Sequence, residues 1–345
     1  MANSNDTRPL TVAVLHGPGG NPDTLTAGLR RAGRPLDLRF VPFHDLDHIR
    51  RTKASRPLTE AERREEPVLT EAHKADLREA EVLFATDLPS DIAVLMPRLR
   101  WMHALTAGTD HLSVLLPKGV VLTTSSGAGA RGMAEFVFAR LLQVWKHLRA
   151  IEDQQQRKVW QKQFGRTLAG HTIGIVGYGA IGQATARLAQ AFGLRVLGLR
   201  RNDAAGDPAG IAERIGGLGD LPWLLAESDI VVLSAPDSPE LQDLMGPAQF
   251  AAMRRGAVFC NVARGNLVDE AALLQALRSG HLGAAIIDVM RQEPPPPDGG
   301  LWDAPNLYLS PHCSVALDTY MDRVLDIFID NLERDLQGRP LRNLA

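Results

Sequence analysis

Cysteines are scarce in this sequence. Only Cys260 and Cys313 occur among its 345 residues, which is too few for a disulfide framework. Cys260 lies in an apolar, strand-like run and is expected to be a buried thiol. Cys313 directly follows His312, so its thiol is either packed in the fold or open to oxidation.

Long apolar runs and an excess of charge of one sign are also absent. No apolar stretch reaches the length needed to span a bilayer, and the residues before Pro9 lack a basic segment followed by an apolar one. Lys and Arg number 38 and Asp and Glu number 40, a formal net charge of −2. This balance offers no attraction to nucleic acid or to an anionic membrane. We therefore expect a cytoplasmic protein with neither nucleic acid nor membrane among its partners.

The length and the alternation of elements predict two α/β domains. A chain of 345 residues exceeds one ordinary core, and its 45% hydrophobic and 23% charged residues are typical of a globular protein. Strand-like bursts alternate with helical segments, as in parallel sheets. The expected strands are 10–15, 37–41, 81–85, 101–105, 120–123, 172–176, 195–199, 230–233, 257–261, 284–288 and 307–309. We expect helices over 22–32, 131–155 and 319–337, and a charged, partly helical surface excursion over 44–74.

A glycine-rich turn stands between an expected strand and an expected helix. Its Gly-x-Gly-x-x-Gly pattern in this context indicates a dinucleotide-binding fingerprint rather than a chance match. The first glycine makes a tight turn, the second lets backbone approach a pyrophosphate, and the third lets helix and strand pack closely. The helix N-terminus presents free N–H groups to the anion. The cofactor-binding residues predicted in this turn are Gly177, Tyr178, Gly179, Ala180, Ile181 and Gly182.

Two arginines, Arg200 and Arg201, follow the next expected strand. Arg200 comes 18 residues after Gly182, near the place where an NAD-binding site carries Asp or Glu. Guanidinium groups at that place would instead bind a 2′-phosphate. The pair predicts NADP(H) as the preferred cofactor, with NAD(H) as the alternative. The competing interpretation is that both arginines are ordinary solvated charges.

Three polar residues, Arg264, Glu293 and His312, follow later strands of the same predicted sheet. The carboxyl ends of strands form the ligand crevice of such a sheet. An arginine there can hold a carboxylate and polarise a neighbouring carbonyl, and a histidine can exchange a proton. Asp288, at a strand end, is expected to accept a hydrogen bond from a nicotinamide carboxamide. A surface arginine and a structural histidine are the alternatives, and no metal site is predicted.

Taken together, these motifs resemble the D-isomer-specific 2-hydroxyacid dehydrogenase family. The glycine turn, the Asn-x-Ala-Arg-Gly stretch at Arg264, the Asp-Val-x-x-x-Glu-Pro stretch at Glu293 and the Ser-Pro-His stretch at His312 occur in the family's order. The separations of 29 and 19 residues between these three side chains are also as the family has them. Residues 105–111 resemble its substrate-binding loop, so the resemblance covers nearly the whole chain.

The resemblance implies a fold and a division into domains. It implies two doubly wound parallel sheets, with a Rossmann cofactor domain (residues 123–317) inserted in a flavodoxin-like substrate-binding domain (residues 1–122 and 318–345). It further implies a substrate pocket between these domains. In that pocket, backbone N–H groups of Ala107 and Gly108 would hold the substrate carboxylate.

The resemblance also implies a role for each site residue. His312 would be the acid/base, Glu293 would orient it, and Arg264 would bind the substrate carboxylate and carbonyl oxygen. Further cofactor contacts are implied for Met133, Ala235, Pro236, Val262, Ala263 and Asp288. The expected activity is hydride transfer between NAD(P)H and a 2-oxo acid or D-2-hydroxy acid, as in glyoxylate/hydroxypyruvate reductases. The expected partners are this small molecule and the cofactor.

Some interpretations stay open at this point. The same fold could serve a nucleotide-sensing binding or corepressor-like protein, or a dehydrogenase of formate or phosphite. The excursion over 44–74 is longer than we expect of the family, and Ser234 stands where histidine is common, so the identity of the 2-oxo acid is open. A homodimer through the helix 131–155 and Trp160 is implied, although the amphipathic pattern also fits packing within one chain.

Overall fold

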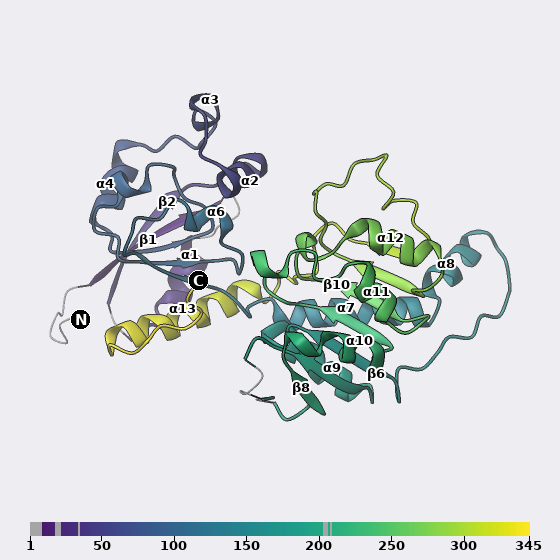
Figure 1. The fold of residues 1–345 in the computed structure, drawn as a ribbon. Helices are drawn as coiled ribbons and strands as arrows, with labels where there is room; N and C mark the ends of the chain where they lie inside the picture. The colour runs from purple at the N-terminus through teal and green to yellow at the C-terminus, as the bar shows by residue number, and fades with distance from the viewer. Residues whose placement is uncertain (1–8, 18–21, 34, 203–205, 208) are drawn as a thin grey trace. The chain divides into compact units, whose positions relative to one another are not determined.

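The chain forms two compact units in the computed structural model, which describes residues 9–17, 22–33, 35–202, 206–207 and 209–345 (Figure 1). The first unit runs to Ala128 and resumes over Asp318–Ala345, and the second is Gly129–Leu317. The expected first boundary, between residues 122 and 123, falls inside a strand of the first sheet, so that sheet continues beyond it. The residues in which we sought a secretion signal, 1–8, lie outside the described part.

The first unit contains a five-stranded parallel sheet in the order β2-β1-β3-β4-β5, the flavodoxin-like order. Its strands are β1 (Leu10–His16), β2 (Leu36–Pro42), β3 (Val82–Ala85), β4 (Trp101–Ala104) and β5 (Val121–Thr124). Its helices are α1 (Pro22–Leu29), α2 (Asp47–Ser55), α3 (Glu60–Arg63), α4 (Glu71–Glu79), α5 (Ile92–Leu95), α6 (Asp110–Ser113) and α13 (Tyr320–Leu336). The charged excursion over 44–74 is therefore partly helical, as expected, because it contains α2, α3 and the start of α4.

The two faces of the first sheet pack against different helices. In β3, Val82 and Phe84 face a core shared with α1 and α13, whereas Leu83 and Ala85 face a core shared with α4, α5 and α6. This division follows from the alternation of side chains along a strand. Phe328 of α13 stacks on Phe84 with ring centroids 4.6 Å apart. Burial of such a side chain stabilises the fold by about 1.5–3 kcal/mol, which ties the last helix to the first sheet.

The second unit contains a seven-stranded parallel sheet in the order β12-β11-β10-β9-β6-β7-β8. Its strands are β6 (Thr172–Val176), β7 (Arg195–Leu199), β8 (Arg214–Gly216), β9 (Ile230–Leu233), β10 (Val258–Asn261), β11 (Ala284–Ile287) and β12 (Leu307–Leu309). Its helices are α7 (Ala130–Trp145), α8 (Leu148–Gln156), α9 (Ala180–Ala191), α10 (Leu221–Glu227), α11 (Pro247–Ala252) and α12 (Glu270–Arg278), with short 3₁₀ helices η2 (Leu218–Asp220), η3 (Pro239–Leu241) and η4 (Gly265–Leu267).

Helices cover both faces of this second sheet as well. In β9, Ile230 and Val232 pack into a core with α7 and α9, while Val231 and Leu233 pack into a core with α10, α11 and α12. All four side chains are fully buried. A strand buried on both faces belongs to a doubly wound sheet. The expected fold class, two doubly wound parallel-sheet domains of Rossmann and flavodoxin-like type, is confirmed.

The expected helix over 131–155 is wrong in one respect, because it is two helices. α7 ends at Trp145 and α8 begins at Leu148, and His147 between them has a left-handed backbone with φ of 55°. Trp145 is the last apolar anchor of α7, buried edge-on against His171 with ring centroids 4.7 Å apart. No residue of α8, all of which are described, is buried. No core packing therefore holds α8 in line with α7.

Three further features of the fold bear on the expectations. The sequence reading missed β8, which is three residues long, begins with an exposed arginine and extends the sheet beyond β7. Among the described residues, no helix combines the length and the apolar character needed to cross a membrane. Cys260 is fully buried, as expected, and this burial raises the pKa of its thiol.

Candidate active site

The glycine turn joins β6 to α9 with the geometry of a phosphate cradle. Gly177 has φ of +100°, and a Cβ there would collide with the backbone of Ala235. A Cβ at Gly182 would meet the carbonyl oxygen of Gly177, which is the close helix–strand approach that the fingerprint requires. A Cβ at Gly179 would meet no described atom within 4 Å, so the backbone there is open to a ligand.

The start of α9 supplies donors to the same cradle. Gly179 is the N-cap of α9, and within the described part of the chain no side chain caps it. The first N–H groups of a helix have no intrahelical partner, so those after Gly179 can bind an anion. Tyr178 is held by contacts within the protein, and its contact with the cofactor stays a prediction. Its ring is buried, its N–H donates to Leu199 O at 2.7 Å, and its hydroxyl bonds Asp207.

The remaining predicted cofactor residues surround the carboxyl edge of the second sheet. Arg200 and Arg201 follow β7; Arg200 is half-buried and donates to Gly206 O at 2.9 Å, and Arg201 is exposed. The others are Ala235 and Pro236 after β9, Val262 and Ala263 after β10, and Met133 on α7, where it packs against the core. An open glycine backbone, an uncapped helix start and two cations fit a phosphorylated dinucleotide. The individual contacts stay predictions.

His312 and Glu293 lie side by side in the loops after β12 and β11. The imidazole Nδ1–H donates to Glu293 Oε2 at 2.9 Å, and Glu293 Oε1 accepts from Met290 N–H at 3.0 Å. The Glu293 carboxylate is thus fixed by the backbone on one side and holds the imidazole on the other. The His312 side chain keeps 50% exposure, so Nε2 is the ring nitrogen left to exchange a proton.

The electrostatics of this pair favour a charged imidazole. The hydrogen bond that His312 donates to Glu293 raises the pKa of His312, and burial and the positive charge of Arg264 oppose that rise in part. Burial acts to raise the pKa of Glu293, but hydrogen bonds from His312 and from Met290 N–H hold it below its ordinary value. The carboxylate therefore stays ionised and stabilises an imidazolium.

Arg264 lies after β10, near enough for its charge to act on His312. The turn that carries it is built by Asn261, a fully buried residue that ends the strand. Asn261 Nδ2 donates to Arg264 O at 3.0 Å, and Asn261 Oδ1 accepts from Ala263 N–H at 3.0 Å. Gly265 packs so closely on the backbone of Met290 that any side chain would collide. The half-buried guanidinium also donates to Ala263 O at 2.8 Å.

Asp288 is the anchor of the His312 loop, a role that the sequence reading missed. Its carboxylate is fully buried and accepts from Ser310 Oγ at 2.7 Å and from the N–H groups of Cys313 and Ser314 at 3.0 Å each. Its backbone carbonyl also accepts from His312 N–H at 2.9 Å. The expected bond from Asp288 to a carboxamide stays a prediction.

Two residues that support the site through hydrogen bonds, Asn261 and Ser310, were not predicted from the sequence. Each is a polar residue that ends or directly follows an otherwise apolar strand, and that position was the available signal. The predicted substrate residues Ala107 and Gly108 follow β4 in the first unit, where Ala107 is exposed and Gly108 is half-buried. Arg264, Glu293 and His312, by contrast, all lie in the second unit.

Comparison with known proteins identifies the family of this chain. The family model described as D-isomer specific 2-hydroxyacid dehydrogenase, NAD binding domain, matches residues 138–314. Glycerate dehydrogenase of Methylorubrum extorquens is 33% identical over 278 residues, which cover 76% of this chain and 85% of that protein. Glyoxylate/hydroxypyruvate reductase B of Citrobacter koseri is 33% identical over 288 residues, covering 80% and 88%.

A solved structure gives the same result for the fold. The D-isomer specific 2-hydroxyacid dehydrogenase of Xanthobacter autotrophicus Py2, crystallised in complex with NADPH and MES, is 28% identical. It aligns over 96% of this chain and 98% of its own with a TM-score of 0.76. The family match also spans the glycine turn and the three clustered side chains. The chain belongs to the D-isomer specific 2-hydroxyacid dehydrogenase family and is an NAD(P)-dependent oxidoreductase of 2-oxo and 2-hydroxy acids.

Proposed function

We propose that the protein reduces a short 2-oxo acid to the D-2-hydroxy acid with NADPH, using His312 as the acid, Glu293 to orient it and Arg264 to bind the substrate. The observation that carries this proposal is the 2.9 Å bond from His312 Nδ1 to Glu293 Oε2 beside the charge of Arg264. Such a group can bind an anionic carbonyl compound and give it a proton.

The cofactor would lie on the glycine turn. Its pyrophosphate would be held by Gly179 and the first N–H groups of α9, and its 2′-phosphate by Arg200 and Arg201. When bound, the nicotinamide supplies the hydride that the reduction consumes. The preference for NADPH is supported by Arg200 and Arg201, which directly follow β7 where an NAD-binding site carries an acidic residue, and by the NADPH in the Xanthobacter structure.

The side chains of this protein perform the acid–base part of the reaction. Arg264 binds the substrate carboxylate and draws electron density toward the carbonyl oxygen. His312 Nε2–H donates its proton to that oxygen as it gains negative charge. Glu293 stabilises the imidazolium before the transfer and fixes the ring so that Nε2 points away from the carboxylate. In the oxidative direction, neutral His312 removes the same proton.

The names of the relatives support a short 2-oxo or 2-hydroxy acid as the substrate. The curated relatives named above act, by their names, on glycerate, glyoxylate or hydroxypyruvate. These are short acids, and we propose a substrate of that size. The N–H groups of Ala107 and Gly108 are proposed to hold its carboxylate.

We also propose that the protein is a homodimer. Trp160 and Phe164 follow α8 with 97% and 84% exposure, and they lie in a segment with no helix or strand. Large apolar side chains gathered on one exposed segment mark an interaction site. A second copy of this chain would cover them.

The proposal is tested by following the absorbance of NADPH with a panel of short 2-oxo acids, with NADH in parallel. Consumption of NADPH that depends on glyoxylate, hydroxypyruvate or a similar acid, and that exceeds consumption of NADH, is expected. Equal rates with both cofactors would contradict the cofactor preference. No turnover with any acid, despite measurable NADPH binding, would contradict the activity and favour a nucleotide-sensing protein.

A further inference from the structure

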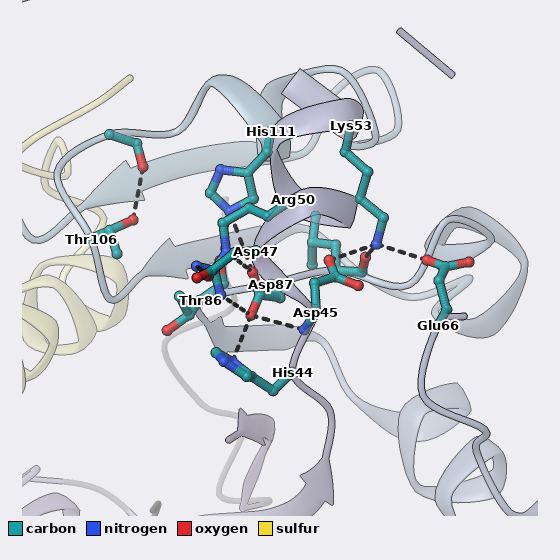
Figure 2. A network of polar contacts seen from close by, with 12 residues as sticks. His44, Asp45, Asp47, Arg50, Lys53, Glu66, Thr86, Asp87, Thr106 and His111 are labelled. Atoms are coloured by element: carbon teal, nitrogen blue, oxygen red, sulfur yellow. Dashed lines mark hydrogen bonds and ion pairs between the residues drawn. The ribbon is translucent and has the colours of Figure 1, made fainter. Parts of the chain in front are cut away.

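A cluster of charged side chains around the buried Asp87 lies at the carboxyl edge of the first sheet (Figure 2). We call it the Asp87 cluster; its members are His44, Arg50, Asp87 and His111. They come from four places in the chain: the segment after β2, helix α2, the segment after β3, and helix α6 after β4. The cluster therefore connects segments that follow β2, β3 and β4 at one edge of the sheet.

Asp87 is the centre of this cluster, and its side chain has 0% exposure. Arg50 donates two hydrogen bonds to its carboxylate, from Nε to Oδ1 at 2.6 Å and from Nη2 to Oδ2 at 2.9 Å. His44 Nδ1 lies 2.9 Å from Oδ2, and the N–H of Asp45 donates to the same oxygen at 3.3 Å. Burial acts to raise the pKa of Asp87, but Arg50 and His44 hold it below its ordinary value. The buried carboxylate therefore stays charged and paired.

His111 joins the cluster to the predicted substrate loop. Its Nε2–H donates to Thr86 O at 2.9 Å, and the same nitrogen lies 3.6 Å from Asp87 Oδ1, within the distance of an ion pair. Its side chain is 10% exposed. At the other end of the loop, Thr106 O accepts from Ser125 N–H at 3.1 Å, and within the loop Thr106 Oγ1 donates to Gly108 O at 2.8 Å (Figure 2). Both ends of residues 106–111 are thus fastened, and Ala107 and Gly108 lie between them.

A second buried pair extends the support. Lys53, one turn beyond Arg50 on α2, donates to Asp45 Oδ2 and to Leu88 O at 2.7 Å each, and it forms an ion pair with Glu66 at 2.7 Å. Its side chain is 1% exposed. The excursion over 44–74 is therefore bound to the sheet edge by two cations, the half-buried Arg50 and the buried Lys53.

The charges of this region argue against an anion-binding role. Arg50 and Lys53 are its two permanent cations, and both are already paired with carboxylates. The carboxylates in the same contacts are Asp45, Asp47, Glu66 and Asp87. An anionic substrate would meet excess negative charge here, so the region is suited to holding protein segments together.

We propose that Asp87 is a positioning residue, which holds the loop 106–111 through His111 so that the backbone N–H groups of Ala107 and Gly108 are preset to receive the substrate carboxylate. The part that concerns the carboxylate rests on the proposed function. The part that concerns the loop rests only on the contacts above. A loop that is already fixed in its binding conformation loses less conformational entropy when substrate binds. If the contacts that fix it are removed, we therefore expect substrate binding to weaken first.

The test compares wild type with Asp87→Asn and His111→Ala in the full-length protein. Loss of a contact to a charged group changes the equilibrium between the closed and the open loop by about tenfold or more. We expect amide hydrogen exchange over residues 106–111 to accelerate by about tenfold in both variants. We expect the KM for the 2-oxo acid to rise by a similar factor with a smaller change in kcat, and the Kd for NADPH to stay unchanged.

Two further variants separate positioning from general loss of stability. Asp335 accepts a two-pronged bond from Arg100 at 2.8 and 2.7 Å, where the chain enters β4 at the opposite end of the same sheet. Asp335→Asn is the matched control and should leave both the loop exchange and the KM unchanged. His111→Gln keeps an N–H that can reach Thr86 O and should restore much of what His111→Ala loses.

The outcomes distinguish this inference from the proposed function. Unchanged exchange over 106–111 in Asp87→Asn and His111→Ala would overturn the positioning role, whatever the activity. Faster exchange with an unchanged KM would overturn the presetting of Ala107 and Gly108. If Asp87→Asn does not fold, His111→Ala decides alone, because it leaves the Asp87–Arg50 bonds in place. A wild-type protein without 2-oxo acid turnover would contradict the proposed function, and the exchange comparison would still decide the role of Asp87.

Discussion

At the scale of single residues, the site depends on a histidine held in a demanding conformation. His312 has φ of 51°, in the left-handed region that residues other than glycine rarely adopt. Its N–H lies 2.9 Å from Asp288 O and 3.0 Å from Ser310 O, and its ring is bound to Glu293. Strained backbone persists where surrounding contacts fix it, and it concentrates at functional sites. Asp288 and Glu293 together therefore set the direction of the imidazole.

Glu293→Gln should change the pH dependence of the reductive reaction. The carboxylate raises the pKa of His312, so its replacement by an uncharged amide lowers that pKa. Reduction needs protonated His312 and is lost as the pH rises through its pKa. The basic limb of kcat/KM against pH should therefore move to lower pH. Glu270→Gln, which changes a carboxylate bonded to Arg291 N–H in the same unit, is the control. An unmoved limb in Glu293→Gln would refute the orienting role.

Arg200→Asp should change the choice of cofactor. If Arg200 binds the 2′-phosphate, its loss removes a charge-assisted bond and adds a repulsion. The ratio of kcat/KM with NADPH to that with NADH should fall by about tenfold or more. Arg255→Asp, an exposed arginine of the same unit, controls for the change in net charge. A ratio untouched by Arg200→Asp would show that Arg200 is an ordinary solvated charge.

The residues of the site were predictable to different degrees. Arg264, Glu293 and His312 were predicted because chemically distinctive side chains follow strands at the carboxyl edge of one sheet. The anchoring role of Asp288 was not, because its partners, Ser310, Cys313 and Ser314, lie in a loop whose path the sequence does not reveal. The Asp87 cluster was missed for the same reason: it joins segments that only the folded sheet brings together.

At the scale of elements, the strand–turn–helix unit β6–α9 carries the cofactor proposal. Gly179→Ala tests it, because a methyl there meets no described protein atom and would point into the space reserved for the ligand. Stability should change by less than about 0.5 kcal/mol, as for surface substitutions, while the Kd for NADPH rises by about tenfold or more.

Gly219→Ala is the matched control for that prediction. Gly219 also has open space around it and lies in η2, outside the glycine turn. Thermal unfolding and fluorescence titration of NADPH would be measured on both variants. Equal NADPH affinity in Gly179→Ala and wild type would refute the cradle.

Elements with strong apolar patterns were predicted well, and short or exposed ones were not. β6, β9 and β10 are buried along their whole length, so their apolar runs identified them. β8 has three residues with an exposed arginine, and its place at the sheet edge depends on pairing with β7. The break at His147 was hidden because α8 continues an amphipathic pattern without burying any of its residues, all of which are described.

At the scale of the whole molecule, the alternation of strands and helices was enough to predict two doubly wound sheets. It was not enough to place the division between the units, which lies after Ala128 rather than after residue 122. The reason is β5, whose pairing with β4 assigns it to the first sheet. The sequence pattern alone likewise does not reveal whether the exposed apolar segment with Trp160 and Phe164 binds a second chain.

The dimer proposal belongs to this scale. Wild-type protein should sediment as a dimer, and Trp160→Ser combined with Phe164→Ser should shift it toward the monomer, because the exposed aromatic surface is removed. Val68→Ser changes another strongly exposed apolar residue, 91% exposed in the first unit, and should leave the dimer intact. A monomeric wild type, or a double variant that remains fully dimeric, would contradict this interface.

The central claim, that His312 gives the proton in the reduction of a 2-oxo acid, is tested most directly by His312→Gln. Its kcat with NADPH and the best 2-oxo acid should fall by roughly 10²–10⁴, the usual contribution of a general acid, while the Kd for NADPH stays unchanged. His281→Gln, which alters a histidine bonded to Met253 O in the same unit, should keep wild-type turnover. Retention of more than about a tenth of wild-type kcat in His312→Gln would contradict the account.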